Sequence, residues 1–365
     1  MHYSHKHPEN QPEFKGLTVN EGVEQLPTVN PYRQKRQKKQ ALSGDDYVKG
    51  ILEGNIAILS QAVTLVESSL PEHQEIAQEV IEKCLPHAGG SVRLGITGVP
   101  GAGKSTFIES LGMHLVRNGH KLAVLAIDPS SERSKGSILG DKTRMEELSV
   151  AANAFIRPSP SAGSLGGVAR KTRESIVLCE AAGFDTIFVE TVGVGQSETA
   201  VHSMVDFFLL IQLAGTGDEL QGIKRGIMEM ADGIAINKCD GNNKDKADVA
   251  RVQFQNALHL FPSPDSGWSP RVVCCSAIEH TGIADVWQMV TDFIQFTKEN
   301  GYFEHKRNSQ SKYWMYESIN AHLQSHFYQN DKIKKLLNEA EKDVLSNKKS
   351  SFIAAKNLLD EYYNI

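Results

Sequence analysis

Between residues 91 and 297, short apolar runs alternate with longer segments in which apolar residues recur every three or four positions. The short runs are typical of buried strands, and the periodic segments are typical of amphipathic helices. They predict strands at 91–97, 122–127, 154–156, 186–189, 205–213, 233–236 and 271–275, and a closing helix at 283–297. Because strands that alternate with helices form parallel sheets, we predict an α/β fold with a mostly parallel sheet covered by helices on both faces.

The segments on either side of this domain carry helical periodicity without a strand pattern. Residues 43–90 predict an N-terminal helical extension, in which Ser43 and Asp46 have the spacing of a capping box. Apolar residues recur from Val48 to Val66 as in one helix, Pro71 interrupts the pattern, and a second helix is expected at 76–85. Residues 298–365 predict further helices, whose apolar surface must pack on their own core domain or on a second copy of the chain.

The first 42 residues are polar, have no apolar period and predict a disordered tail. The tail ends in a basic run at 33–39, which without interleaved aromatic residues favours a solvated segment over a nucleic-acid contact. A net charge of −5, no apolar h-region at the start and no run of about 18 apolar residues argue against secretion, membrane insertion and general affinity for nucleic acid. Five cysteines lack zinc or redox spacing, so we expect reduced thiols in a cytoplasmic protein.

Residues 98–106 match the phosphate-binding loop G-x-x-x-x-G-K-[ST], between a predicted strand and a predicted helix. Its glycines allow the backbone N–H groups to surround phosphate oxygens, which the positive end of the following helix also attracts. Lys104 would reach the β- and γ-phosphates, and the Ser105 hydroxyl would bind Mg²⁺. The whole loop is expected to bind nucleotide: Gly98, Val99, Pro100, Gly101, Ala102, Gly103, Lys104, Ser105 and Thr106. We therefore predict a P-loop NTPase.

A second motif selects the base. Asn237, Lys238 and Asp240 form N-K-x-D after a predicted strand, and the next strand ends at Ser276, Ala277 and Ile278. A carboxylate can accept two hydrogen bonds from N1–H and the exocyclic amine of guanine, a donor pair that adenine lacks. The order of the two motifs therefore predicts binding of GTP and GDP.

Carboxylates at other strand ends predict the metal site and hydrolysis. Glu190 and Gly193 stand where many GTPases carry Asp-x-x-Gly, so the carboxylate would hold Mg²⁺ and the glycine N–H would sense the γ-phosphate. Asp128 and Asp141 are further candidates to bind Mg²⁺ or orient water. Asp128 could instead cap a turn, and Asp141 could pair with a basic neighbour, Lys142 or Arg144. Val194 follows Gly193 where an activating glutamine would stand, which predicts slow intrinsic hydrolysis.

Together these motifs resemble the methylmalonyl-CoA mutase-associated G proteins, the MeaB/ArgK group, over about residues 43–365. The resemblance rests on these stretches: 98–106, 128–131 (Asp-Pro-Ser-Ser), 136–145, 157–160 (Arg-Pro-Ser-Pro), 190–198 and 217–224. It implies a GTPase that protects methylmalonyl-CoA mutase, gates adenosylcobalamin loading and helps to remove inactivated cofactor. It also implies a homodimer formed through the C-terminal helices, a partner-sensing switch at 215–224, and a metal and hydrolysis set made of Ser105, Asp128, Asp141 and Glu190 together with Lys104.

Other interpretations stay open from the sequence. A nickel-insertion GTPase would need a metal-transfer cluster, for which only His2, His5 and His7 in the tail are candidates. A kinase linked to basic amino-acid transport would need an acceptor pocket. A nucleotide bound only as a structural ligand would not require the three carboxylates Asp128, Asp141 and Glu190.

Overall fold

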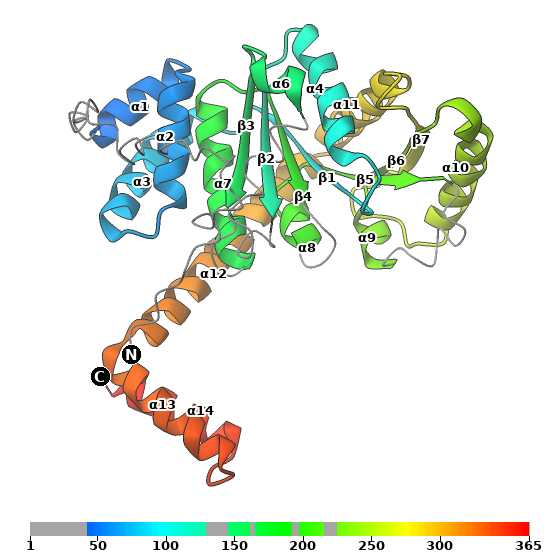
Figure 1. The fold of residues 1–365 in the computed structure, drawn as a ribbon. Coiled ribbons are helices and arrows are strands. Elements are labelled where there is room, and N and C mark those ends of the chain that lie inside the picture. Colours follow the sequence, from blue (N-terminus) through cyan, green and yellow to red (C-terminus); the bar gives the residue numbers. More distant parts are fainter. Residues whose placement is uncertain (1–41, 129–144, 161–164, 192–196, 215–224, 365) are drawn as a thin grey trace, which may run out of the picture. The chain divides into compact units, whose positions relative to one another are not determined.

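In a computed structural model the chain divides into residues 1–41 and 42–365, and the residues described here are 42–128, 145–160, 165–191, 197–214 and 225–364 (Figure 1). This described part contains one seven-stranded sheet, in the order β3-β2-β4-β1-β5-β6-β7. Every pair of neighbouring strands runs parallel. The strands are β1 Val92–Gly98, β2 Leu122–Asp128, β3 Ala154–Pro160, β4 Thr186–Thr191, β5 Phe207–Leu213, β6 Gly233–Asn237 and β7 Arg271–Cys274. The predicted α/β fold with a parallel sheet is thereby confirmed.

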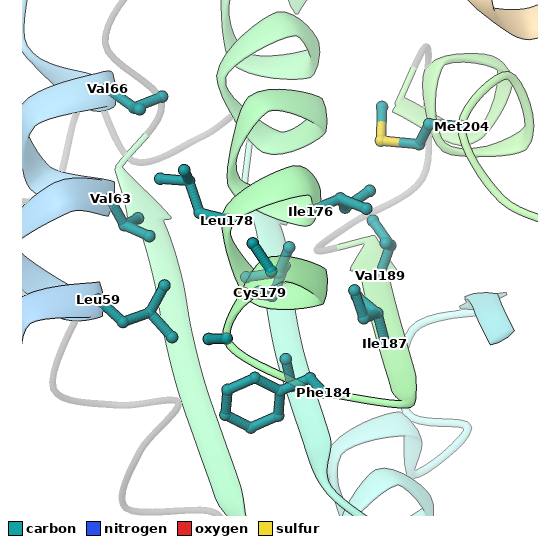
Figure 2. Packing of buried hydrophobic residues seen from close by; sticks show 14 of the residues in the cluster. Leu59, Val63, Val66, Ile176, Leu178, Cys179, Phe184, Ile187, Val189 and Met204 are labelled. Carbon is teal, nitrogen blue, oxygen red and sulfur yellow. The ribbon is translucent and has the colours of Figure 1, made fainter. Parts of the chain in front are cut away.

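Helices cover both faces of the sheet, because alternate residues of the central strands point to opposite sides. In β4, Phe188 packs in a core with α4 and α11, whereas Ile187 and Val189 pack with α7 and the N-terminal helices. Figure 2 shows Ile187 and Val189 beside Ile176 and Cys179 of α7, with Leu59, Val63 and Val66 of α2 beyond. The helices of the first face are α4 Lys104–Arg117, α6 Glu146–Val150 and α11 Ile283–Glu299, and those of the second include α7 Leu165–Ala181, α8 Ser197–His202, α9 Arg225–Met230 and α10 Lys244–Leu258.

The N-terminal extension begins with the predicted capping box. Ser43 Oγ accepts from the Asp46 N–H at 3.2 Å, and the Asp46 carboxylate accepts from the Ser43 N–H at 3.0 Å. The expectation of one helix up to Val66 is wrong, because the chain turns at Gly54, whose φ of +72° suits glycine, and Asn55 caps a new helix. Pro71 stands between two helices as predicted, but the second begins at Pro71 itself and not at residue 76, because the missing N–H of proline costs nothing in a first turn. The elements are α1 Gly44–Leu52, α2 Ile56–Glu67, α3 Pro71–Cys84 and η3 Leu85–His87.

The start of β5 differs from expectation, whereas residues beyond the sheet form helices as predicted. The strand predicted at 205–213 begins only at Phe207, because Val205 and Asp206 belong to a turn that bonds to another helix. Beyond the sheet, the chain forms α12 Tyr302–Gln329, α13 Asp331–Leu345 and α14 Ser351–Tyr363, and the short η4 Gly241–Asn243 precedes α10. Within the described residues, no helix combines the length and the apolar character that a bilayer crossing requires.

Candidate nucleotide site

The predicted motifs gather at one edge of the sheet, where the carboxyl ends of the parallel strands meet. Ile96 of β1 and Ala126 of β2 both stand in register with Glu190 of β4. Strands β1 and β2 therefore end two residues beyond the level of Glu190, at Gly98 and Asp128. Ligands of open α/β sheets bind beyond this edge, which makes it the candidate site.

The loop from Gly98 to Lys104 has backbone conformations that require glycine. A Cβ on Gly98 would lie 2.3 Å from the Ile211 carbonyl oxygen of the adjacent β5, and Gly103 has a φ of +83°. Helix α4 begins directly afterwards at Lys104, so Ser105 and Thr106 occupy its first turn. The unpaired N–H groups of that turn and of the loop can bind phosphate oxygens.

Lys104 is the cation of this loop. Its ammonium donates to the Gly98 carbonyl oxygen at 2.9 Å. Burial lowers the pKa of Lys104, while the carboxylates of Glu190 and Glu198 act in the opposite direction. A half-buried ammonium group at the start of a helix suits the oxygens of a polyphosphate.

The described residues also fit a magnesium ion held mainly by the nucleotide. Ser105 supplies a hydroxyl and Glu190 a carboxylate, the oxygen ligands that Mg²⁺ prefers, and Mg²⁺ usually keeps water and phosphate oxygens as its remaining ligands. In the parts of the chain that the structure describes, no group of three or more His, Cys, Asp or Glu residues could hold a metal on its own. Asp141 and Gly193 lie outside the described residues, as does the segment 215–224, and Asp128 is placed only by its backbone at the end of β2.

Asn237 joins the phosphate loop to the base-binding loop. Its Nδ2 donates to the Ala102 carbonyl oxygen at 2.8 Å, and its Oδ1 accepts from the Ala277 N–H at 3.1 Å. The side chain is buried, so both bonds are made away from water. Asn237 therefore holds the two loops together, a role that its place in N-K-x-D does not reveal.

Asp240 is positioned for base recognition by Ser276. The buried Ser276 hydroxyl donates to Asp240 Oδ2 at 2.5 Å and accepts from the Glu279 N–H at 3.1 Å. Lys238 is exposed and adopts a φ of +61°, and Ile278 exposes 72% of its surface. The structure thus brings all the predicted base-binding residues into one loop pair at the ends of β6 and β7.

Sequence reasoning missed other residues near the site. Glu198 lies in the first turn of α8, is almost fully buried and influences the charge of Lys104. Thr191 donates to Thr97 Oγ1 at 2.9 Å, which ties the ends of β4 and β1 together. His280 follows the base-binding loop and bonds through Nδ1 to Ser110 of α4 at 2.7 Å. Glu198 stands in a quoted motif, but the partners of the other residues are too distant in sequence to be guessed.

Two of the cysteines meet beside Asp240. Cys239 and Cys274 lie within hydrogen-bonding reach of each other, and burial raises the pKa of both thiols, that of Cys274 to about 12. The described cysteines are all free, and a raised pKa keeps them protonated and poorly reactive. Free thiols are what the sequence led us to expect of these cysteines.

Known proteins resemble the chain over most of its length. Residues 59–332 match the model of the family described as methylmalonyl Co-A mutase-associated GTPase MeaB. A probable GTPase of Mycobacterium tuberculosis is 47% identical over 320 residues, which are 87% of this chain and 95% of that protein. The GTPase ArgK of Escherichia coli is 48% identical over 284 residues, or 78% of this chain and 86% of its own.

An animal protein and a solved structure extend the likeness. The mitochondrial methylmalonic aciduria type A homologue of Mus musculus is 43% identical over 345 residues, covering 92% of this chain and 83% of its own. The crystal structure of a LAO/AO transport system kinase superposes with a TM-score of 0.69 at 39% identity, covering 88% of this chain and 98% of that one. The chain is thus similar in sequence to proteins named as GTPases, and its fold resembles that of the transport system kinase.

Proposed function

Because the chain belongs to the methylmalonyl-CoA mutase-associated GTPase family, we propose that it binds GTP and GDP with Mg²⁺ and hydrolyses GTP. The observation that carries this proposal is the Asn237 bridge, which connects a phosphate loop to a base loop ending in Asp240. Such a bridge fixes the distance between the two loops, as a nucleotide that spans both would require.

The residues of the chain have separate tasks in this proposal. Bound Mg²⁺ would neutralise charge on the β- and γ-phosphates, with Ser105 and Glu190 as ligands and Asp128 and Asp141 as further candidates. Lys104 donates to the same phosphate oxygens, and the N–H groups of the loop and of the first turn of α4 orient them. Asp240 accepts from guanine, and Ser276 holds its carboxylate in place. Without a glutamine after Gly193, hydrolysis by the isolated protein is expected to be slow.

Calorimetry with the full chain and Mg²⁺ tests nucleotide binding. GTP and GDP should bind at least about 100-fold more tightly than ATP, because adenine would leave Asp240 unpaired. Lys104→Ala should remove most of the affinity, whereas Lys246→Ala, an exposed lysine of α10, should leave it unchanged. A preference for ATP, or equal affinity of the two lysine variants, would contradict the proposal. Release of inorganic phosphate from GTP, rather than its transfer to another protein, separates a GTPase from a kinase.

We further propose that the client is an adenosylcobalamin-dependent methylmalonyl-CoA mutase, which the chain protects and reactivates and whose cofactor loading it gates. The family description and the name of the mouse relative support this client. Its test is co-purification with a mutase in the presence of GDP or a non-hydrolysable GTP analogue, with recovery of inactivated mutase as the second readout. Absence of binding in both nucleotide states and unchanged recovery would exclude this client while leaving the GTPase intact.

The C-terminal helices support a homodimer, which we propose as the working form. The end of α12 and helices α13 and α14 border an apolar groove of about 770 Å³, lined by residues that include Leu323, Phe327, Leu358 and Tyr362. Several large side chains nearby are exposed, among them Phe352 at 85%. Burial of such a surface against a second copy would stabilise it. Light scattering should give a dimer for the wild type and a monomer for Leu359→Asp, with Asn347→Asp as control; a monomeric wild type would refute the dimer.

A further inference from the structure

One face of α12 binds the backbone between α8 and β5. The α8–β5 turn, residues 203–206, and the last residue of α8 offer their carbonyl oxygens to side chains of this helix. The donors are Lys306 to Asp206 at 2.7 Å, Gln310 to Val205 at 2.9 Å and to His202 at 3.5 Å, and Trp314 to Ser203 at 3.1 Å. Because the three donors are spaced by four residues, they form one stripe along α12. A single helix thus donates to the carbonyl groups of Ser203, Val205 and Asp206 in this turn.

The contact is buried and directional. Gln310 and Trp314 expose only 7% and 6% of their surfaces. Loss of either donor would remove the partner of a buried carbonyl group, which is unfavourable away from water. The Gln310 Oε1 atom is itself buried and has no hydrogen-bond partner among the described residues. Among the described residues, the contact is therefore held by the Gln310 amide N–H groups and not by its carbonyl oxygen.

The base of α12 is anchored both to this turn and to the segment before β1. The Arg307 guanidinium forms an ion pair with Asp206 at 2.7 Å and donates to the carbonyl oxygens of Gly89 and Ser91. These partners lie at the amino end of β1 and at the turn before β5, far along the strands from the phosphate loop. The start of α12 is thereby fixed to the sheet, while Gln310 and Trp314, further along the helix, are bonded to α8 and its turn.

The opposite end of α8 reaches the nucleotide site. Glu198 is buried in its first turn, and its carboxylate acts to raise the pKa of Lys104. At the other end, the carbonyl oxygen of His202, the last residue, accepts from Gln310 at 3.5 Å. The whole helix has six residues, or about 9 Å, and three of them are buried. A triphosphate that binds Lys104 brings negative charge close to Glu198, so the first turn of α8 experiences a changed field.

We propose that α8 couples the phosphate end of the nucleotide site to α12, with Gln310 and Trp314 as the positioning residues that receive its movement. The coupling rests on the proposed function, because it needs a nucleotide at Lys104. Helix α12 has 28 residues, or about 42 Å, so a rotation of about 5° at its base moves its far end by about 4 Å. The C-terminal helices would then take different positions with GDP and with GTP.

Fluorine NMR of the full chain labelled with 5-fluorotryptophan tests the coupling. The chain has three tryptophans, and Trp314→Phe assigns the resonance of Trp314. We expect this resonance to differ between the GDP form and the form with a non-hydrolysable GTP analogue, while that of Trp268, which donates to the Asp232 carbonyl on the other side of the sheet, stays constant. Gln310→Met, similar in size but without a donor, should reduce the difference by at least half.

Matched controls separate this result from failure of nucleotide binding. Gln329→Met, at an exposed position at the end of the same helix, should preserve the difference. Calorimetry on the same samples should show GTP affinity within about threefold of wild type for both glutamine variants. An unchanged Trp314 resonance in samples that bind both nucleotides overturns the coupling alone, as does a full response in Gln310→Met. Samples that bind neither nucleotide overturn the proposed function and the coupling together.

Discussion

In the base half of the site, Asn237, Asp240, Ser276 and Ala277 are hydrogen-bonded into one unit, whereas in the phosphate half Lys104 lies in the field of two carboxylates. The first arrangement consists of directional bonds, made by the buried residues Asn237, Ser276 and Ala277 and the half-buried Asp240. The second depends on the balance between an ammonium group and the charges of Glu190 and Glu198. Addition of a polyphosphate changes that balance directly.

The difference separates recognition from response. A base half that is already hydrogen-bonded loses little entropy on binding, so it can favour guanine equally in the GDP and GTP forms. A phosphate half held by opposed charges responds to the number of phosphates, because each one adds negative charge beside Glu190 and Glu198. We therefore expect substitutions in the base half to alter which base is bound. Substitutions in the phosphate half should alter how the protein responds to GTP as compared with GDP.

Asp240→Asn should have the largest effect. The amide replaces an acceptor by a donor toward the guanine amine, so GTP affinity should fall by about 1000-fold, roughly 4 kcal/mol. Xanthine nucleotides, which carry a carbonyl oxygen in place of that amine, should gain affinity. Calorimetry with both nucleotides measures the change, and Asp285→Asn, an exposed carboxylate of α11, is the control. Retained GTP preference would show that Asp240 does not contact the base.

Asn237→Ala should affect both halves at once. The substitution leaves the Ala102 carbonyl and the Ala277 N–H without their partner, which should lower the free energy of unfolding by about 3 kcal/mol. Urea unfolding measures this loss, and calorimetry should show a decrease in affinity of about tenfold or more for GTP and GDP alike. If the stability falls while both affinities stay unchanged, the bridge does not position the loops for nucleotide.

His202→Gln should change the pH dependence of stability through the end of α8. Burial lowers the pKa of His202 to about 4, with Lys306 acting in the same direction, from an ordinary value of 6.5. The folded protein keeps this imidazole neutral, so its contribution to stability is complete above pH 6.5 and is lost as the pH falls toward 4. Between pH 6.5 and 4.5 the wild type should therefore lose about 2 kcal/mol more unfolding free energy than His202→Gln. If urea unfolding gave the same loss of unfolding free energy between pH 6.5 and 4.5 for wild type and His202→Gln, this assignment would be contradicted.

Thr191→Val should have the smallest effect. It removes the donor to Thr97 Oγ1 beneath the phosphate loop, at a cost of about 1 kcal/mol. The double variant with Thr97→Val should recover most of that loss, since two apolar side chains leave no buried hydroxyl unpaired. Thermal unfolding of the four members of this cycle measures the pair, and additive losses would show that the hydroxyl groups act independently.

Local patterns predicted the elements and the motif positions well, because apolar runs and glycine spacing act over a few residues. The capping box at Ser43 and the strands around the phosphate loop are examples. The break at Gly54 was missed, because the apolar period continues across it although the helix axis changes. Asn237 was assigned to the base, but its Nδ2 partner, Ala102, lies 135 residues earlier. Likewise, the contact of Trp314 with Ser203 depends on how α12 packs, which no local pattern encodes.

The strand order has a consequence for the nascent chain. Strand β1 lies between β4 and β5, so it emerges from the ribosome well before both of its neighbours, which begin at residues 186 and 207. Until translation passes residue 213, this apolar segment lacks the strands that shield it, and a truncated product would expose it to chaperones or to aggregation. Guanine selection needs still more of the polypeptide, because Ser276 and Ala277 are among the later residues to be translated. Ligand-assisted folding can therefore begin only when about three quarters of the protein has been made.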